Sequence, residues 1–173
     1  MKQNATRIYN RALFYLQRFS ATEKHLETVL LRQLENKRRK GDEVPDEAPQ
    51  WVRETVTKCV NLGLVNDRAF AESRLNTLRR QGRSIHYIKQ HMAQKGVPKQ
   101  IILDLLQDNN PEDELQAAIR LVERRRLGRD TTPDGRQKDL AKIVRAGFAF
   151  DIAKKALGKK ESSLSLGERE EQL

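Results

Sequence analysis

The sequence is poor in features that mark several large classes of protein. Its 173 residues include one cysteine, Cys59, which excludes an intramolecular disulfide framework and a cysteine-rich zinc site. No apolar run approaches the roughly 18 residues of a membrane span, and the first residues lack the apolar stretch of a signal peptide. These absences predict a protein of a reducing compartment, the cytoplasm, with no membrane partner.

Catalytic and metal-binding patterns are missing as well. His86 and His91 are five residues apart, about 140° around a helix, so they do not form the i, i+4 pair that binds zinc. Cys59 lies in an apolar stripe with no histidine nearby in sequence, which is typical of a small buried hydrophobe. Phosphate-binding glycine loops and nucleophile elbows do not occur. We therefore expect a binding protein rather than an enzyme, with no metal and no other cofactor.

What the sequence has in excess is positive charge. Lys and Arg number 34 against 24 Asp and Glu, a net charge of +10, which predicts attraction to polyanions. By segment the net charge is +4 over 1–66, +5 over 67–107, +4 over 108–160 and −3 over 161–173. Leu, Ile, Val and Phe make up about 25% of the chain, enough for a folded protein with a thin core.

Apolar residues recur with the period of an α-helix along almost the whole chain, and no stretch alternates for long enough to form a strand. The first buried stripe runs from Ile8 to Phe19. Ser20 and Glu23 then form a capping box that starts the next helix. Val144 belongs to the buried stripe of the eighth helix. The pattern predicts about nine helices and an all-α fold.

Two parts of the chain resemble each other. The motif from Lys95 to Ile101 recurs 51 residues later, from Ala146 to Ile152, with glycine second and isoleucine seventh in both. We interpret the chain as tandem three-helix repeats, three units in all, that stack into an elongated, curved array. The predicted boundaries are 1–63 for the first repeat with an insertion at 36–50, 64–107 for the second, 108–158 for the third, and 159–173 for an acidic, disordered tail.

On two of the predicted helices, basic residues gather opposite the apolar stripe. One helix carries Arg120 and Arg124, and the next carries Lys138, Lys142 and Arg145. A solvated outer face is the simplest interpretation, because charged side chains lie outside. Since basic positions recur in all three repeats, we also expect a surface that binds phosphates or acidic protein without reading base sequence. Further expected contact residues are Arg79, Arg80, Arg83 and Lys89.

Other basic features have simpler interpretations. The runs 37–40 and 124–126 each end a helix, where cations offset the negative end of the helix dipole. Arg74 falls within an apolar stripe, so its charge either reaches the edge of the core or meets a partner. The two helices around Gly96 resemble a helix-turn-helix. The second, 98–107, lacks side chains that read base edges, so major-groove recognition is disfavoured.

The order and spacing of the helix caps and core residues resemble the RecX family, regulators of the bacterial recombinase RecA. The resemblance covers about residues 8–158 and is carried by Leu62–Asp67, Phe70-Ala71, Gly82, Ile88, Lys95–Val97, Ile101 and Arg136–Leu157. It implies tandem three-helix repeats that bind in the groove of the RecA filament on single-stranded DNA. It further implies inhibition of the ATPase, strand-exchange and coprotease activities of RecA, in DNA repair, recombination and the SOS response.

We therefore expect a monomeric, non-enzymatic modulator whose partners are the RecA filament and single-stranded DNA. The alternative is a sequence-neutral DNA-binding protein that acts independently of the recombinase, and an enzyme is less favoured than either. The insertion at 36–50 and the acidic tail depart from the family pattern. The tail is a candidate competitor with DNA for the basic surface. The sequence leaves open whether filaments are capped or lose subunits.

Overall fold

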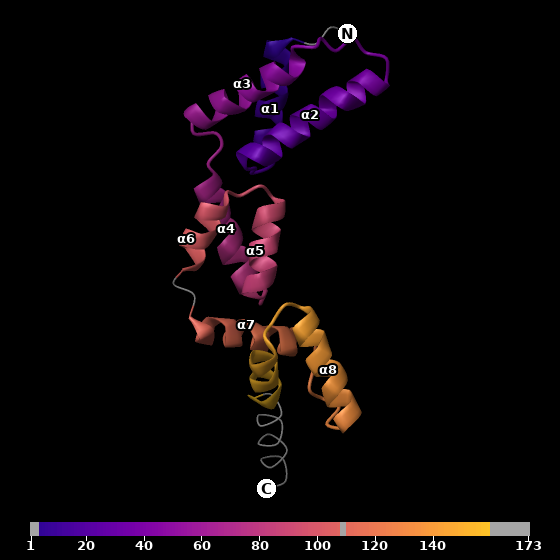
Figure 1. Cartoon of the computed structure of the whole chain (residues 1–173), viewed down its shortest axis with the longest axis vertical. Helices are drawn as coiled ribbons and strands as arrows, with labels where there is room; N and C mark the ends of the chain where they lie inside the picture. The colour runs from indigo at the N-terminus through magenta and orange to yellow at the C-terminus, as the bar shows by residue number, and fades with distance from the viewer. Residues whose placement is uncertain (1–3, 108–109, 160–173) are drawn as a thin grey trace. The chain divides into compact units, whose positions relative to one another are not determined.

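The computed structural model describes residues 4–107 and 110–159. Within these ranges all regular structure is helical and no strand occurs, which confirms the all-α prediction. The helices are α1 (Ala5–Leu16), α2 (Glu23–Arg39), α3 (Ala48–Asn61), α4 (Asp67–Arg80), α5 (Ile85–Gln94), α6 (Lys99–Leu106), α7 (Pro111–Arg124) and α8 (Pro133–Arg145). A ninth helical segment covers 150–159 (Figure 1). Apart from residue 159, the predicted disordered tail lies outside the described residues.

The chain forms two compact units. Unit 1 comprises Met1–Glu72 and Met92–Ile102, and unit 2 comprises Ser73–His91 and Leu103–Leu173. The divisions fall inside α4, α5 and α6, so each of these helices contributes to both units. The division into three repeats and the elongated, curved shape stay predictions.

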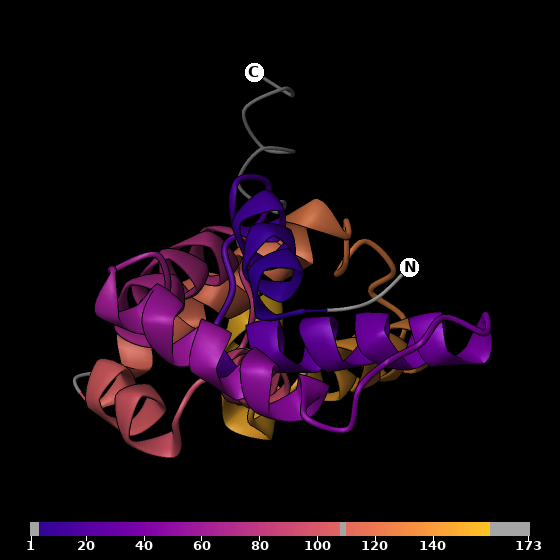
Figure 2. The same cartoon turned by 90° about the horizontal axis from the view of Figure 1, so that it is seen from above.

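In unit 1 the helices α1, α2 and α3 pack around one apolar core (Figures 1 and 2). Their buried side chains follow the helical spacing seen in the sequence. Ile8, Leu26, Leu30, Val52 and Cys59 are almost completely buried. Burial raises the pKa of the Cys59 thiol, because the thiolate is poorly solvated there. The prediction that Cys59 is a small buried hydrophobe is therefore confirmed.

The start of α2 corrects a predicted boundary. The N-cap is Thr22, whose hydroxyl oxygen accepts a hydrogen bond from the N–H of His25 at 3.1 Å. The predicted capping box of Ser20 with Glu23 is wrong, since Ser20 is exposed and precedes the helix, and Glu23 is the first helical residue. Thr22 is completely buried. A buried hydroxyl needs hydrogen-bond partners, and the Thr22 hydroxyl finds them only when Thr22 is the N-cap of α2.

Two predicted core positions are also corrected. Phe19 lies beyond the end of α1 and is 55% exposed, while Val144 on α8 is 39% exposed. The ends of α2 and α3 enter the insertion predicted at 36–50, so only 40–47 are non-helical.

A junction in unit 1 joins the start of α2 to the turn between α5 and α6. The Thr22 hydroxyl donates a hydrogen bond to the carbonyl oxygen of Lys95. The next residue, Gly96, has φ +81°, and a Cβ added there would lie 2.7 Å from Cβ of Lys24. Glycine is therefore required for two reasons, the left-handed backbone and the close approach to α2.

Unit 2 contains the same arrangement between the start of α5 and the turn that follows α8. Ser84 caps α5, accepting a hydrogen bond from the N–H of Tyr87 at 3.2 Å. Its hydroxyl donates to the carbonyl oxygen of Ala146 at 2.8 Å. Gly147 follows with φ +93°, and an added Cβ would lie 2.6 Å from Oγ of Ser84. One hydroxyl and one glycine thus hold each junction.

A carboxylate completes each junction. The N–H of Glu23 donates to Oδ1 of Asp67 at 2.9 Å, and the N–H of Ile85 donates to both carboxylate oxygens of Glu114 at 3.1 Å. These N–H groups belong to the first helical residues of α2 and α5, which have no partner within their own helix. Burial raises the pKa of Asp67 and of Glu114, although the hydrogen bonds from the N–H groups oppose the shift.

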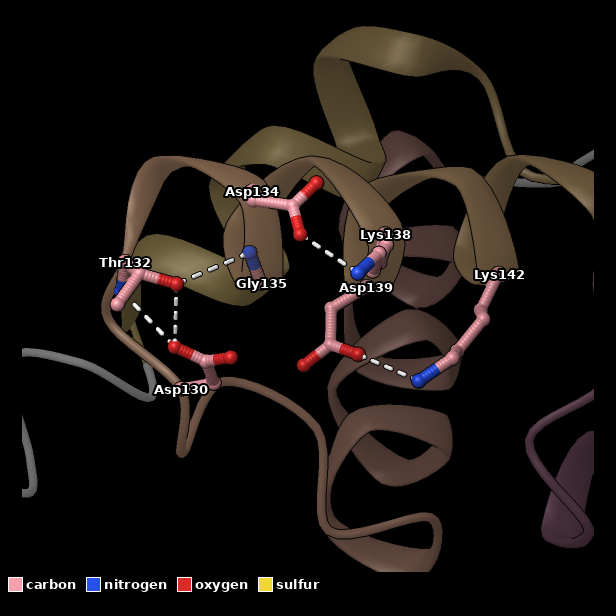
Figure 3. Close-up of polar contacts among 7 residues, drawn as sticks. All are labelled: Asp130, Thr132, Asp134, Gly135, Lys138, Asp139 and Lys142. Carbon is pink, nitrogen blue, oxygen red and sulfur yellow. Dashed lines mark hydrogen bonds and ion pairs between the residues drawn. The ribbon is translucent and has the colours of Figure 1, made fainter.

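The start of α8 satisfies its polar groups locally (Figure 3). The Thr132 hydroxyl donates to Oδ1 of Asp130 at 2.6 Å and accepts from the N–H of Gly135 at 3.1 Å. The hydrogen bonds that Asp130 accepts from the hydroxyl and from the N–H of Thr132 hold its pKa below the ordinary value. Pro133 occupies the position that Glu23 and Ile85 hold in the other two helices, and proline has no N–H to donate. This helix therefore needs no carboxylate from another segment.

The close approach at Gly96 generates a stability prediction. Gly96→Ala is expected to lower the free energy of unfolding by about 3 kcal/mol, because it adds a clash with Lys24 to the cost of a left-handed alanine. Gly41→Ala is the matched control. Gly41 also has φ +81°, but nothing lies within 4 Å of an added Cβ, so about 1–2 kcal/mol is expected. Urea unfolding followed by circular dichroism measures both values, and equal losses would contradict the predicted role of the close approach.

Candidate functional site

A long stretch of unit 2 with cations and no acidic residue runs from α4 into α5. Residues 73–91 contain five cations and no Asp or Glu. Arg79 and Arg80 end α4, and Arg83 lies in the turn before α5. Carbonyl groups at the end of a helix carry partial negative charge, which favours cations at this place. Arg80 is exposed, whereas Arg79 and Arg83 are half-buried.

Two arginines of α7 reach the same turn from a distant part of the sequence. Arg120 donates from Nη2 to the carbonyl oxygen of Arg79 at 3.4 Å, and Arg124 donates from Nη1 to the carbonyl oxygen of Gln81. Gly82 permits the approach, since a Cβ there would lie 2.9 Å from a backbone oxygen of α7. We name these five residues the arginine cluster: Arg79, Arg80, Arg83, Arg120 and Arg124.

The contacts within the arginine cluster orient its side chains and leave its charge largely in place. Carbonyl oxygens carry only partial charge, so they do not neutralise Arg120 and Arg124, which are both exposed. The guanidinium carbon of Arg83 lies 4.6 Å from the ring centroid of Tyr87, in cation–π contact. Burial raises the pKa of Glu114, and the positive charge of Arg79 opposes this larger effect by lowering that pKa. The cluster is therefore a concentrated positive surface whose exposed members, Arg80, Arg120 and Arg124, are held by neutral carbonyl groups.

The second predicted group, on α8, is partly neutralised within its own helix (Figure 3). Lys138 forms an ion pair with Asp134 at 2.6 Å, and Lys142 forms one with Asp139 at 2.8 Å. Nε of Arg145 donates to a carbonyl oxygen one turn earlier at 3.2 Å. The Lys138 and Asp134 side chains are 68% and 74% exposed, and pairs of this kind contribute 1 kcal/mol at most in general. A polyanion therefore competes readily for Lys138.

Asp139 has a structural role that the sequence did not reveal. It is buried, and its Oδ2 accepts a hydrogen bond from the N–H of Gly128 at 2.8 Å while Oδ1 accepts one from Lys142. Burial alone would raise the pKa of Asp139. The hydrogen bonds from Lys142 and Gly128 outweigh that effect, so the pKa lies below its ordinary value of 3.8. The carboxylate thus ties the segment after α7 to α8.

The structure divides the predicted contact residues into two groups. Arg120 and Arg124, which sequence reasoning placed with the basic face of α8, lie instead with the arginines at the end of α4. Lys138, Lys142 and Arg145 share α8. Lys89 is exposed on α5, within the segment that has no acidic residue. Arg74 is half-buried. Whether any of them binds a partner stays a prediction.

Sequence reasoning missed the features that hold the arginine cluster together. The acceptors are main-chain carbonyl groups, which have no signature in the sequence. The one usable signal is Gly82, two residues after the arginine pair that ends α4, since a glycine at the end of a helix marks a turn that another element can approach closely. Asp67 and Glu114, whose carboxylates accept hydrogen bonds at the two junctions, had no feature in the sequence that indicated this role beyond their place at the starts of helices.

Two further properties of the described residues bear on the site. They hold no group of three or more His, Cys, Asp and Glu residues that is arranged to bind a metal ion. Among their helices, none combines the length and apolar character needed to cross a membrane.

Comparison with known proteins finds similarity to one family. The family profile described as RecX, second three-helix domain, matches residues 66–106. A protein named Regulatory protein RecX from Myxococcus xanthus is 38% identical over 162 residues, which cover 90% of this chain and 87% of that protein. A protein of the same name from Agrobacterium fabrum is 29% identical over 153 residues, covering 86% of this chain and 80% of the relative.

Solved structures share the fold. The crystal structure of RecX from Lactobacillus salivarius superposes with a TM-score of 0.67 at 24% identity, covering 90% of this chain and 95% of that one. A second crystal structure, of a regulatory protein RecX, gives a TM-score of 0.68 at 24% identity, with coverages of 88% and 72%. At this level of identity the likeness establishes the all-helical fold.

The contacts of Asp139 generate a prediction about stability and pH. Asp139→Asn is expected to lower the free energy of unfolding by about 1–2 kcal/mol at pH 7, because the charged hydrogen bond to Lys142 is lost. The folded-state pKa is lowered, so this contribution is present above pH 3.8 and is lost as the pH falls through the folded-state value. The difference between wild type and variant should therefore vanish in strong acid.

The matched control for Asp139→Asn is Asp134→Asn on the same helix. Its ion pair with Lys138 is exposed at both ends, so less than about 0.5 kcal/mol is expected. Thermal unfolding at a series of pH values measures both variants. Equal destabilisation by the two substitutions, or a difference at Asp139 that persists unchanged at pH 2, would contradict the assignment.

Proposed function

The chain belongs to the RecX family of regulatory proteins, and from that premise we propose that it binds the filament formed by the RecA recombinase on single-stranded DNA. The protein inhibits the ATPase, strand-exchange and coprotease activities of RecA, and it supplies no reaction of its own. It acts as a monomer in the cytoplasm, in DNA repair, recombination and the SOS response. The single observation that carries this proposal is the 38% identity to a Regulatory protein RecX over nearly the whole of both chains.

The charge distribution supports a partner that is a polyanion. The net charge is +10, and the arginine cluster gathers five of the cations around one turn of unit 2. A RecA filament on DNA offers phosphates to such a surface. Contacts of this kind bind without reading base sequence, as a regulator that acts along a filament requires.

The arginine cluster is the better candidate for the main contact than the basic face of α8. Lys138 and Lys142 each have a carboxylate partner in their own helix. The exposed members of the cluster, Arg80, Arg120 and Arg124, are oriented by main-chain carbonyl groups and retain full charge. Side chains that are already oriented lose less conformational entropy when a phosphate binds.

The test is a titration of RecA with this protein while ATP hydrolysis on single-stranded DNA is measured. Wild-type protein is expected to stop hydrolysis at amounts comparable to RecA or lower. The variant Arg80→Gln, Arg120→Gln, Arg124→Gln should need at least about tenfold more protein, because each lost phosphate contact weakens binding. Unchanged hydrolysis at an excess of wild-type protein would refute the proposal.

A variant with an equal loss of charge serves as the control. Arg38→Gln, Arg39→Gln, Lys40→Gln removes three exposed cations from the end of α2 in unit 1. If it weakens inhibition as much as the change in the arginine cluster, the effect comes from net charge and not from a site. Circular dichroism and the unfolding temperature show whether each variant is folded.

The second candidate is a sequence-neutral DNA-binding protein that acts without the recombinase. The observation in its favour is the same concentration of oriented arginines, which would bind phosphates of any DNA. This function requires tight binding to naked DNA with a steep loss of affinity as salt rises. The combination of such binding with no effect on RecA would favour it over inhibition of the filament.

A further inference from the structure

The end of α1 and the turn that follows it carry exposed aromatic rings. Phe14 is 58% exposed and Phe19 is 55% exposed. The half-buried ring of Tyr15 lies 5.2 Å from the ring of Phe19, centroid to centroid. We name Phe14, Tyr15 and Phe19 the aromatic patch. Single exposed apolar residues are common on proteins, whereas two exposed rings within six residues indicate a contact surface.

The backbone holds the aromatic patch in place. The carbonyl oxygen of Tyr15 accepts hydrogen bonds from the N–H groups of Arg18, at 3.1 Å, and Phe19, at 3.0 Å. The helix that carries Phe14 and Tyr15 is anchored through Ile8 and Ala12, which are buried against the core of unit 1. Phe19, beyond the helix, is tied to it by its backbone hydrogen bond to Tyr15, so little entropy is lost when the rings bind a ligand.

The segment of sequence that carries the aromatic patch is basic. Residues 4–22 contain Arg7, Arg11 and Arg18 and no acidic residue. The guanidinium carbon of Arg18 lies 4.5 Å from the ring centroid of Phe14, which aligns a cation with an exposed ring. The first carboxylate of the sequence is that of Glu23, at the start of α2.

These two properties together select the chemistry of the ligand. Exposed rings alone suit any apolar partner, and arginines alone suit any polyanion. A ligand that offers flat apolar faces and a negative backbone at once is single-stranded nucleic acid, whose bases stack on aromatic side chains without sequence preference. A duplex does not fit, because its bases are already stacked on one another.

We propose that the aromatic patch binds single-stranded DNA by stacking of unpaired bases on Phe14 and Phe19, with Arg18 placed for the adjoining phosphate. This site is in unit 1 and is separate in sequence from the arginine cluster. The proposal deepens the proposed function. It rests on that function only for the choice of DNA as the single-stranded nucleic acid that the protein meets. The binding itself is tested without the recombinase.

The experiment measures fluorescence anisotropy of two labelled oligomers on the order of 15 nucleotides long, oligothymidylate and an abasic strand of equal length. Phe14→Ala, Phe19→Ala is expected to weaken oligothymidylate binding at least tenfold and to leave binding of the abasic strand unchanged. The slope of affinity against salt should also stay the same, because no phosphate contact is removed. Unchanged oligothymidylate binding, or equal losses on both strands, would overturn the proposal.

Two further variants separate stacking from general apolar contact and from misfolding. Phe14→Leu, Phe19→Leu keeps apolar side chains but removes the flat rings, so it too should weaken oligothymidylate binding. Retention of wild-type affinity by this variant would overturn stacking. Phe150→Ala removes a ring that is 61% exposed in unit 2 and should have no effect. A loss of the same size would show that the effect does not belong to the patch.

The ATPase titration keeps this proposal distinct from the proposed function. If Phe14→Ala, Phe19→Ala binds oligothymidylate like wild type but no longer inhibits RecA, the patch docks on protein and the stacking proposal is overturned. If wild-type protein leaves RecA unaffected while its oligothymidylate binding depends on the two rings, the stacking proposal is supported and the proposed function fails.

Discussion

A buried hydroxyl at the start of a helix is the constraint on which both units depend. Thr22 and Ser84 each accept a hydrogen bond from their own helix and donate one to a carbonyl group of a distant turn. Left without either partner, such a buried group would cost about 1–3 kcal/mol. The turn can reach the hydroxyl only because a left-handed glycine follows the accepting carbonyl, with no room for a Cβ. A single polar contact thus sets how two remote segments meet within each unit.

The positive surface of unit 2 is a consequence of the same kind of packing. The turn around Gly82 lies against α7 closely enough for Arg120 and Arg124 to reach the carbonyl groups at the end of α4. Cations that stabilise the end of a helix are thereby concentrated at one place. The structural and the proposed functional roles of these arginines are compatible, since a carbonyl contact orients a guanidinium without neutralising it.

Local rules predicted much of the fold. Asn110 and Ser84, residue types that favour the start of a helix, cap their helices, and the glycines at 63, 82, 96 and 147 all have positive φ. The wrong prediction at Ser20 falls where two residues could cap the helix, and the one used, Thr22, also makes a tertiary contact with the carbonyl group of Lys95. Every cation of the candidate site could be named from the sequence. The ion pairs of α8 could be named as well, because they have the i, i+3 and i, i+4 spacing of ordinary helix pairs. No spacing in the sequence indicated that Arg120 lies beside the end of α4.

The sequence by itself determined the helical class, the turn positions, the excess of positive charge and the family to which the chain belongs. These depend on periodicity, on the φ angles open to glycine and on composition, all of which act over a few residues or over the whole chain at once. Tertiary structure alone decided which hydroxyl caps α2, which arginines share a surface and which rings stay exposed. Those outcomes depend on main-chain carbonyl groups brought close by packing, and every residue carries the same carbonyl group.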